Sequence, residues 1–394
     1  MKKAFLFPLI FLLLSLLSSC EKGDAVFSVG EMHVFCPAAH TPDEGEYLYT
    51  NDVISETVVT TDTGTYAVFT NGINISSPTN VTYRIMRLTE SGWEAVAEDG
   101  KTLRMNTLRI FSNQKGKLAV VSLWNKGIGF GLYNETTGEF SETILNRGSH
   151  YLNYVCGIDP NAGKEGVVYV IVSHRIWDKD TKLIAFDIAT QTVSEQVFSQ
   201  TPYSEASGTL LFNEGVGHVF IQNGDGTLCY LTLQNAGTPD QTVSAPLEIT
   251  DPNGDPASLI LESVSMDKGG KLYVFYSSFN DDSQTTHCSL INKGTVENTI
   301  HLPGSPFAVR SFTDPDGRVY YVCMTPGTTE GLVCSVENES IKEKLSFHLD
   351  DAPNLMFYHS ISTSNQGGIP DNGTWLVYPC DDRINFVTVR LDIR

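Results

Sequence analysis

The strongest constraint on the fold is a short pattern that recurs seven times along the chain. Each copy consists of a polar run, a turn containing glycine and a run of strongly β-forming residues. In the fifth copy, Asp267-Lys268-Gly269-Gly270-Lys271 precedes Leu272–Ser277 (LYVFYS). Successive turn glycines lie 47 to 56 residues apart, and they are Gly64, Gly116, Gly166, Gly217, Gly270, Gly317 and Gly373. A period of about 50 residues with several strands in each repeat indicates a propeller or a related array.

Each repeat contains four strand signals, which become more polar from the first to the last. In the fifth repeat these signals are Ile260–Met266, Leu272–Ser277, Thr286–Ile291 and Thr295–Ile300. The second carries large apolar residues at a density that indicates burial on both faces. An order from apolar to polar fits a blade whose first strand lies at an axis and whose fourth lies at the rim. The sequence therefore predicts an all-β, seven-bladed β-propeller.

The two ends of the chain predict how the ring closes. The seventh repeat holds three strand signals before Arg394, and an unassigned β-forming run, Val29–Phe35, stands near the N-terminus. This run would supply the missing outer strand of the last blade, and closure removes sheet edges that would otherwise aggregate. A ring of six or eight blades and a two-sheet sandwich are the alternatives, although a sandwich predicts no such period.

The first twenty residues have the organisation of an export signal. Lys2 and Lys3 precede an apolar run from Ala4 to Leu17, and the sequence Leu-Ser-Ser-Cys ends at Cys20. The run is too short for a membrane span and ends in small residues. It resembles the bacterial lipoprotein signal, which implies cleavage before Cys20 and lipid attachment to that cysteine. A plain secretory signal with an incidental cysteine is the alternative.

This resemblance predicts a signal at 1–20, a short linker at 21–28 and a single propeller domain at 29–394. Glu21-Lys22-Gly23-Asp24 also resembles the acidic stretch that follows the lipidated cysteine in surface-exported lipoproteins of Bacteroides-like bacteria. The implied location is the cell envelope, with a lipid anchor in the outer membrane and exposure at the cell surface. Several acyl chains at one terminus would hold the protein firmly.

The charge balance excludes some partners. The chain has 26 basic and 46 acidic residues, a net charge of −20, and loss of Lys2 and Lys3 with the signal would make it more negative. Such a surface repels phosphate backbones, so we expect no nucleic-acid partner. It also disfavours highly sulfated polyanions unless a local basic patch binds them.

Cysteines and acidic turns give little support for a metal site. Seven cysteines besides Cys20 stand singly in apolar runs with no CxxC motif, so we expect buried thiols and no structural zinc. Cys323 and Cys334 could form a disulfide across the hairpin between them. Asp-rich turns such as Asp314-Pro315-Asp316-Gly317 could bind calcium, but turns use these residues in any case. We therefore expect no cofactor, with calcium as the alternative.

Two turns carry a motif of known propellers. Ser265-Met266-Asp267 followed by Gly270-Lys271-Leu272-Tyr273-Val274 resembles the Asp-box, or BNR repeat, of sialidase-like propellers, and Ser311–Tyr320 repeats part of it. In that family the Ser, Asp and Gly stabilise a hairpin far from the active site, so the resemblance concerns architecture. Sialidase activity itself is not expected, because no Phe-Arg-Ile-Pro-like segment follows the signal.

Polar residues at one position of several first strands could surround the axis. They stand seven or eight residues before a turn glycine, or further back where the turn is longer, and are Glu56, Arg109, Tyr154, Glu262, Arg310 and His359. Such a ring could bind a ligand, since glycosidases need paired carboxyl groups and anionic sugars need arginine forks. The alternative is that these side chains hydrogen-bond to one another and fill the channel.

A second cluster flanks the turn of the third repeat. His150 and Tyr154 precede that turn, and His174, Arg175 and Trp177 follow it. The set resembles the histidine-bearing blade of BNR-type propeller polysaccharide lyases, which cleave glycans that contain uronic acids. The resemblance implies that His150 or Tyr154 removes the proton α to a carboxylate, that His174 and Arg175 neutralise the carboxylate, and that Trp177 contacts the ligand. This chemistry needs a base of near-neutral pKa and a cation. Exposed loop residues without a catalytic role are the alternative.

These features predict an envelope lipoprotein whose propeller binds or helps to process polysaccharide at its axial pocket. A carbohydrate-active enzyme, either a BNR-type lyase or a glycoside hydrolase, and a protein-interaction scaffold are the alternatives, because a propeller alone does not define function. The expected partners are a polysaccharide or oligosaccharide, the membrane through the N-terminal lipid only, and outer-membrane glycan-uptake proteins.

Overall fold

A computed structural model describes most of the chain as strands and turns. The described residues are 25–35, 58–70, 82–97, 100–101, 105–124, 127–146, 151–174, 180–199, 207–223, 226–252, 258–280, 283–314, 316–325, 330–337, 339–348, 362–363, 373–379 and 386–393. Within these residues there is no helix, and hence none that is long and apolar enough to cross a membrane. The prediction of an all-β protein is confirmed.

The strands form seven blades that follow one another in chain order. The first blade contains β2 (Val58–Thr61), β3 (Gly64–Thr70), β4 (Thr82–Thr89), β5 (Gly92–Ala95) and β6 (Gly100–Lys101). The second contains β7 (Met105–Ser112), β8 (Lys117–Trp124), β9 (Gly127–Asn134) and β10 (Phe140–Asn146). The third contains β11 (Tyr151–Asp159), β12 (Val167–His174), β13 (Thr181–Asp187) and β14 (Thr192–Ser199). The fourth contains β15 (Ser207–Asn213), β16 (Val216–Gln222), β17 (Leu228–Gln234), β18 (Thr242–Val243) and β19 (Leu247–Ile249).

The last three blades complete the ring, and in each of them neighbouring strands pair in antiparallel fashion. The fifth contains β20 (Ser258–Met266), β21 (Leu272–Asn280), β22 (Ser283–Asn292) and β23 (Thr295–His301). The sixth contains β24 (Phe307–Thr313), β25 (Val319–Met324), β26 (Glu330–Glu337) and β27 (Ser340–His348). The seventh contains β28 (Ser362–Thr363), β29 (Gly373–Pro379), β30 (Phe386–Ile393) and β1 (Phe27–Phe35).

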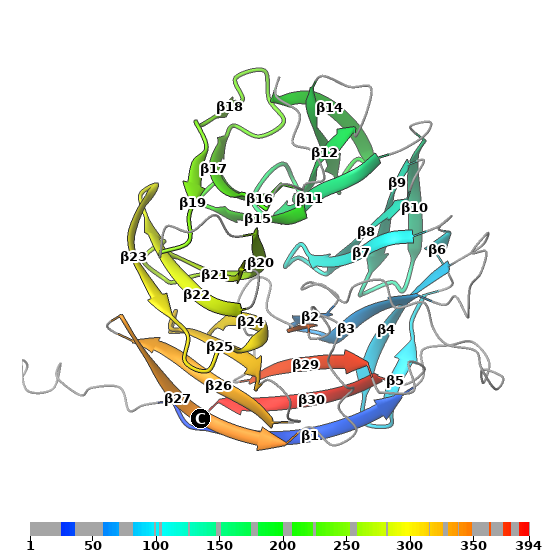
Figure 1. Ribbon diagram of the computed structural model, residues 1–394. Coiled ribbons are helices and arrows are strands. Elements are labelled where there is room, and N and C mark those ends of the chain that lie inside the picture. Colours follow the sequence, from blue (N-terminus) through cyan, green and yellow to red (C-terminus); the bar gives the residue numbers. More distant parts are fainter. Residues whose placement is uncertain are drawn as a thin grey trace, which may run out of the picture.

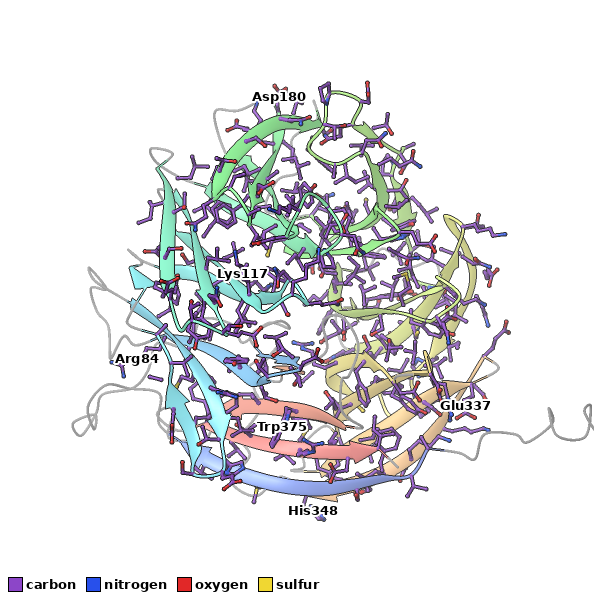
Figure 2. The ribbon with its side chains drawn as sticks, turned by 180° about the vertical axis from the view of Figure 1, so that it is seen from behind. Arg84, Lys117, Asp180, Glu337, His348 and Trp375 are labelled. Atoms are coloured by element: carbon purple, nitrogen blue, oxygen red, sulfur yellow. The ribbon has the colours of Figure 1, made fainter. Side chains whose placement is uncertain are left out.

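The blades surround a central axis, with their first strands nearest the centre (Figure 1). Side chains fill the spaces between neighbouring blades (Figure 2). The buried apolar residues form seven clusters, and each cluster joins two consecutive blades, including the seventh to the first. Seven interfaces for seven blades describe a closed ring. The alternatives of six blades, eight blades and a two-sheet sandwich are therefore wrong.

The N-terminal strand closes the ring as predicted. β1 pairs in antiparallel register with β30, from Phe27 opposite Ile393 to Phe35 opposite Phe386, and a bulge interrupts the register between Val29 and Met32. The predicted strand at Val29–Phe35 thus begins two residues earlier, at Phe27. Closure leaves the chain's first described strand at the rim of the seventh blade, where β1 is the outermost strand (Figure 1).

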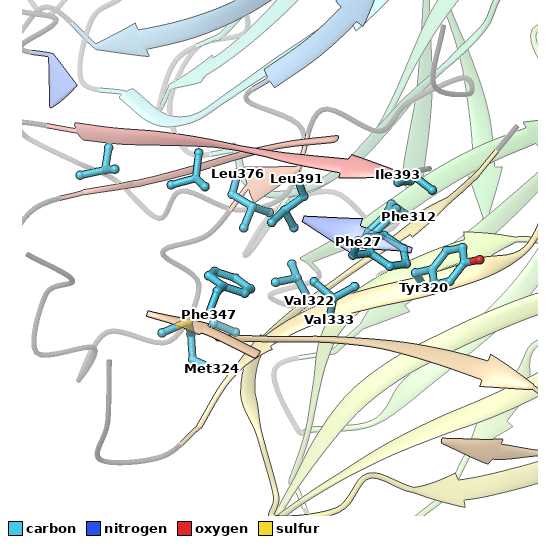
Figure 3. Packing of buried hydrophobic residues seen from close by; sticks show 13 residues of the cluster. Phe27, Phe312, Tyr320, Val322, Met324, Val333, Phe347, Leu376, Leu391 and Ile393 are labelled. Atoms are coloured by element: carbon cyan, nitrogen blue, oxygen red, sulfur yellow. The ribbon is translucent and has the colours of Figure 1, made fainter. Parts of the chain in front are cut away.

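Phe27 fixes β1 to the interior between blades six and seven. Its ring meets the ring of Tyr320 edge to face at a centroid distance of 4.9 Å and that of Phe312 at 6.2 Å. Leu391 and Ile393 of β30 complete this cluster (Figure 3). Edge-to-face aromatic contacts of this kind stabilise by roughly 1 kcal/mol beyond the burial of apolar area. The outer strand is thereby part of the core and not a loosely added edge.

The other side of blade seven packs against blade one. Trp93 of β5 donates a hydrogen bond from Nε1 to Thr388 Oγ1 over 2.8 Å, although the two residues are 295 positions apart. Trp375, labelled in Figure 2, belongs to the same cluster together with Phe386. Blade seven is consequently held on both sides by aromatic residues.

The turns after the first strands explain the repeated sequence pattern. Asn113, Asp267 and Asp314 each accept a hydrogen bond at side-chain Oδ1 from the backbone N–H four residues later, over 2.8 to 2.9 Å. The glycine that follows three residues after each of them has positive φ, for example +81° at Gly270, which side chains disfavour. A carboxamide or carboxylate cap plus a left-handed glycine therefore defines the hairpin.

The predicted turn glycine of the fourth repeat is wrong. Gly217 lies inside β16, and the turn is formed by Glu214 and Gly215, with φ values of +49° and +79°. The β-forming run predicted for this repeat, Val219–Gln222, lies in β16. The slip arose because two glycines flank Val216 and the sequence pattern does not distinguish them.

Blades three and four are joined more closely than the others. Their first strands pair in parallel at Tyr154 and Ser207, so the two blades share one sheet. A Cβ atom on Gly157 would lie 2.0 Å from the carbonyl oxygen of Leu210, far inside van der Waals contact. Only glycine permits this approach of β11 to β15.

Cys323 and Cys334 do not form the disulfide that was the alternative for them, and both residues are buried free thiols. In the register of β25 with β26, Cys334 lies opposite Tyr321 and Cys323 opposite Leu332. The two thiols are therefore diagonal neighbours and not a direct cross-strand pair. Cys156 and Cys288 are also buried free thiols, as expected for cysteines within apolar runs.

Candidate functional site

The antiparallel order of each blade gives the ring two ends. The turns after the first strands lie at one of them, the turn end. We call the other the connection end, and it is where the first strands begin: β2, β7, β11, β15, β20, β24 and β28. The second strand of each blade ends at the connection end, and the third begins there. Two kinds of connection therefore join the strands at this end: the one that leads from a blade to the first strand of the next blade, and the one between the second and third strands of a blade.

Most of the predicted site residues fall outside the described part of the chain. These are Glu56, His150, Arg175, Trp177 and His359, the lipidation residue Cys20, and the side chains of Tyr154 and His174. Their assignments stay predictions. The strand ends beside them are described: β11 begins at Tyr151 and β12 ends at His174, both at the connection end.

The register of the third blade brings the two halves of its predicted cluster together. Tyr151 lies opposite His174, and Tyr154 opposite Val172. Tyr154 also pairs with Ser207 of the fourth blade, which places this part of β11 at the junction of two first strands. The start of β11 and the end of β12 are thus paired at one end of one blade, while His150, Arg175 and Trp177 lie outside the described residues.

Glu262 and Arg310 are the predicted ring residues that the structure brings into contact. Both side chains are almost completely buried, in β20 and β24 of neighbouring blades. Arg310 Nη1 lies 3.4 Å from Glu262 Oε2 and donates to the carbonyl oxygens of Glu262 and Val309 over 2.8 and 2.7 Å. Ser277 Oγ donates to Glu262 Oε1 over 2.9 Å. The pair joins two blades.

Burial and pairing act on Glu262 in opposite directions. Loss of solvent raises the pKa of its carboxyl group above the ordinary value, while Arg310 and the hydrogen bond from Ser277 lower it. Burial is the larger influence. The carboxylate consequently depends on Arg310 for its charge. This arrangement matches the alternative in which polar side chains satisfy one another, and direct contact with a ligand stays a prediction for both residues.

Serine side chains extend this polar contact along the same two strands. Ser311 Oγ lies 2.8 Å from the hydroxyl oxygens of both Ser263 and Ser265, and its backbone N–H donates to Ser263 Oγ over 2.9 Å. Thr313 Oγ1 donates to the Met266 carbonyl oxygen over 3.2 Å. β20 and β24 are therefore linked by side-chain hydrogen bonds where a sheet would use backbone pairs.

Arg109, the third described member of the predicted ring, is buried in β7 of the second blade. It lies opposite Val121 in the register with β8. Arg109 and Arg310 each lie four residues before the residue that caps their turn, Asn113 or Asp314, whereas Glu262 lies at the bulge of β20 between Leu261 and Ser263. Of these three described residues, Glu262 and Arg310 come from consecutive blades and are in direct contact, and a ring around the axis stays a prediction.

A buried polar group in the fifth blade was not predicted. Asp251 follows β19, while Ser278 and His287 belong to β21 and β22. Ser278 Oγ donates to Asp251 Oδ2, which lies 3.9 Å from His287 Nε2. His287 Nε2 also lies 3.0 Å from Thr285 Oγ1. Among the described residues, no hydrogen-bond partner reaches His287 Nδ1.

This group contains Ser, His and Asp but lacks the order of a nucleophilic triad. In a triad the imidazole lies between serine and carboxylate and accepts the serine proton. Here the Asp251 carboxylate accepts the hydrogen bond from Ser278. His287 lies on the other side of this carboxylate and not between it and the serine. The group therefore holds the connection end of the blade together and does not activate Ser278. The sequence offered no signal for it, since Ser278 and His287 each stand alone in a β-forming run and Asp251 begins a turn-like stretch.

Within the described residues, no three His, Cys, Asp or Glu side chains are grouped so that they could hold a metal ion. Asp314 and Asp316, proposed from sequence as part of an acidic turn, both contact Arg318 at 3.6 and 3.1 Å. Asp314 also caps its own turn. These contacts give the acidic turn a structural role, and calcium binding stays untested.

Comparison with solved structures supports the fold. The chain is similar to the polysaccharide lyase Uly1, with a TM-score of 0.53, 10% sequence identity and coverage of 94% of this chain and 99% of that chain. It is also similar to Kuenenia stuttgartiensis hydrazine synthase, with a TM-score of 0.49, 11% identity and coverage of 75% and 80%. For a Penicillium chrysogenum alpha-L-arabinanase these values are 0.47, 13%, 73% and 93%. At such identities the likeness concerns the propeller fold. No protein-family model and no curated protein matches the chain.

The buried ion pair predicts a large effect of Arg310→Met on stability. The substitution would leave the Glu262 carboxyl group buried without its cation, at a cost of about 3 to 5 kcal/mol in the free energy of unfolding. A Glu262→Leu, Arg310→Met double variant should recover much of this loss. Urea denaturation measures both.

Arg318→Met provides the matched control, because Arg318 is a partly exposed arginine in the same blade with two acidic partners. Exposed pairs contribute about 0 to 1 kcal/mol. If Arg310→Met were no more destabilising than Arg318→Met, the structural role of the Glu262–Arg310 pair would be wrong.

The lowered pKa of buried His287 predicts that the protein loses stability in mild acid. Burial lowers the pKa of its imidazole, Asp251 opposes this effect, and His301 adds to it. Because the folded-state pKa lies below the unfolded value of about 6.5, the unfolded chain binds the proton first. The free energy of unfolding should then be constant above that pH and fall below it, by at most about 1.4 kcal/mol per pH unit for one group.

Urea denaturation at several pH values between neutrality and mild acid would measure this slope in the wild type and in His287→Gln. The variant should lose part of the slope, and the remainder should include His218, whose pKa burial also lowers. His348→Gln, at an exposed position at the end of β27 in blade six, serves as the control. Equal slopes in wild type and His287→Gln would contradict the role of His287.

Proposed function

We propose that the protein is a lipid-anchored envelope protein whose propeller binds polysaccharide at the connection end of the ring. The observation that carries the proposal is the register of β11 with β12. It sets Tyr151 opposite His174, and His150, Arg175 and Trp177 stand within three residues of these strand ends in the sequence. These three side chains would together bind an acidic glycan through charge, hydrogen bonds and apolar contact.

The chemistry of these residue types favours a uronic-acid-containing polysaccharide. A guanidinium group can form two parallel hydrogen bonds to one carboxylate, and an indole ring offers a broad apolar surface with one N–H donor. The acidic surface of the protein as a whole opposes unselective binding of polyanions. Selective binding would then depend on the local cations Arg175 and His174.

A lyase reaction is the second candidate, because the same register places Tyr154 in the strand next to His174. Removal of a proton α to a carboxylate requires a base and a cation near each other. His150 or Tyr154 would be the base in this case. The comparison with a polysaccharide lyase supports the fold on which such a site could stand, and the reaction is proposed from the residues alone. Outer-membrane glycan-uptake proteins are the partners that would fit either candidate.

Affinity-gel electrophoresis with acidic and neutral polysaccharides tests the binding proposal. Arg175→Ala should weaken retention by uronic-acid polymers about tenfold or more, since a charge-assisted hydrogen bond contributes roughly 1.5 to 3 kcal/mol. Retention by neutral polymers should change little. Ile144→Ser, an exposed apolar position on the rim of blade two, is the control. A protein retained by no polysaccharide would contradict glycan binding and favour a protein-interaction scaffold.

The lyase candidate has its own readout in the same panel. Elimination creates a carbon–carbon double bond conjugated to the carboxylate, so ultraviolet absorbance should rise with time on a uronic-acid polymer. His150→Ala should abolish the rise while Arg175-dependent retention persists. A polymer that is retained but gives no absorbance change would contradict the lyase and leave binding intact.

Lipid anchoring is tested separately by Cys20→Ser. The proposed lipid attaches through the cysteine thiol, which serine lacks, so the variant should leave the membrane fraction and appear in the soluble envelope fraction. Fractionation followed by immunoblotting measures this. A Cys20→Ser protein that stays with the membrane to the same extent as wild type would contradict a lipid anchor at this residue.

A further inference from the structure

The outermost strand of blade seven exposes an unusual set of apolar side chains. Val29, Met32 and Val34 of β1 are 46%, 50% and 60% exposed, and Val26 just before the strand is 62% exposed. Among the described residues, the other large apolar side chains with comparable exposure are Ile144 and Val197, which lie on the rims of two different blades. Single exposed apolar residues are common on protein surfaces and need no explanation. Three on one strand form a continuous apolar surface, which does.

The three strand residues point to one side of β1. Val29, Met32 and Val34 lie opposite Leu391, Val389 and Val387, which all belong to the cluster between blades six and seven. The bulge between Val29 and Met32 keeps them in phase. We call Val29, Met32 and Val34 the β1 stripe. Because directly opposite residues share a face of the sheet, the stripe lies on the same face of blade seven as this buried cluster.

β1 is also the edge of its sheet. β30 is its only strand partner in the described sheet, and β1 forms the outer boundary of the blade (Figure 1). An edge strand with an apolar stripe promotes aggregation unless something covers it. Among the side chains of β1 that the structure describes, the most exposed large ones are two valines and a methionine.

The chain upstream of β1 indicates what covers the stripe. Val26 lies only six residues after Cys20, and the apolar run Ala4–Leu17 precedes that cysteine. Six extended residues span about 20 Å at most. If Cys20 carries lipid, as proposed above, β1 is held within that distance of a bilayer. Tethering raises the local concentration of lipid around the stripe, so a few apolar side chains suffice for contact.

We propose that the β1 stripe rests in the interfacial region of a lipid bilayer, so that the propeller lies on the membrane with the rim of its seventh blade. The inference rests on the proposed lipid anchoring and adds a second, protein-borne membrane contact to it. The contact is apolar, because the acidic chain would be repelled by anionic lipid. Zwitterionic vesicles are therefore the suitable probe, and added salt should not weaken the contact.

Hydroxyl-radical footprinting read by mass spectrometry tests the contact in the native chain. The acylated full chain on phosphatidylcholine vesicles is compared with a lipid-free chain beginning at Glu21, which keeps every described strand. Oxidation of Met32, Val29 and Val34 should slow about fivefold or more on vesicles, since lipid excludes water from the stripe. Ile144 and Val197, of similar exposure, should react equally in both samples. Equal rates at the stripe would overturn the proposal.

Vesicle flotation of the lipid-free chain separates this proposal from lipid anchoring. Weak flotation should occur, and it should fall about fivefold or more in Val29→Ser, Met32→Ser, Val34→Ser. The Ile144→Ser, Val197→Ser variant should match wild type, and circular dichroism confirms folding of both variants. Flotation that responds to the stripe would uphold the contact even if Cys20→Ser showed that no lipid anchor exists. Absence of flotation together with equal footprints would overturn the contact while leaving the anchor untouched.

A second copy of the chain is the competing occupant of an apolar edge. In that case the stripe of the lipid-free chain would become protected as its concentration rises, and light scattering would show a dimer that the triple serine variant abolishes. This outcome would overturn the bilayer contact.

Discussion

The pairing of β1 with β30 is the interaction on which the ring depends. Blade seven takes its other strands from the C-terminal end of the chain, so this pairing joins segments more than 350 positions apart. Phe27 enters the core between blades six and seven only because β1 is in place. The seven apolar clusters form a closed series in which each blade has two neighbours. Removal of β1 would expose β30 as an edge and weaken the cluster that Phe27 shares with blade six.

The repeat could be predicted from sequence because it is a local property. The β-forming runs after each turn all lie within the second strands, and the leftover N-terminal run closes the ring. These features follow from turn chemistry and apolar density over a few residues. The slip at Gly217 has the same origin, because two nearby glycines offer equally good local turns. The alternative of a disulfide between Cys323 and Cys334 could not be decided from sequence, because their diagonal offset depends on strand register.

Contacts between blades could not be predicted in this way. Glu262 and Arg310 are 48 positions apart, and their pairing depends on how β20 and β24 are offset around the axis. Their spacing from the turn glycines predicted similar positions along the first strands. It did not predict whether the two side chains would contact each other or a ligand. The group of Asp251, Ser278 and His287 was missed because each residue comes from a different strand or connection of the blade. These residues contact one another only once the strands are packed, because packing buries them and makes them one another's hydrogen-bond partners. Such packing depends on the assembled ring and not on local sequence.

The inner strands and the connection end therefore have different physical roles. Between β20 and β24, paired charges and serine hydroxyls replace the backbone pairs of a continuous sheet. Such groups are satisfied where they are, and a ligand would have to compete with bonds already made. The polar contacts between β20 and β24 therefore favour a cohesive role for these inner strands, and the proposed recognition of glycan is assigned to the connection end of blade three.

The ring geometry links the two proposals. In a ring of seven blades, the junction of blades three and four lies across the axis from blade seven, and Figure 1 shows β11 and β15 opposite β1. A propeller resting on a bilayer with the β1 stripe would hold that junction at its greatest distance from the lipid. The first strands of blades three and four meet there, at Tyr154 and Ser207. A long polysaccharide could then approach the predicted cluster without crossing the membrane surface. The strand that closes the ring would thus also decide which blade faces the polymer.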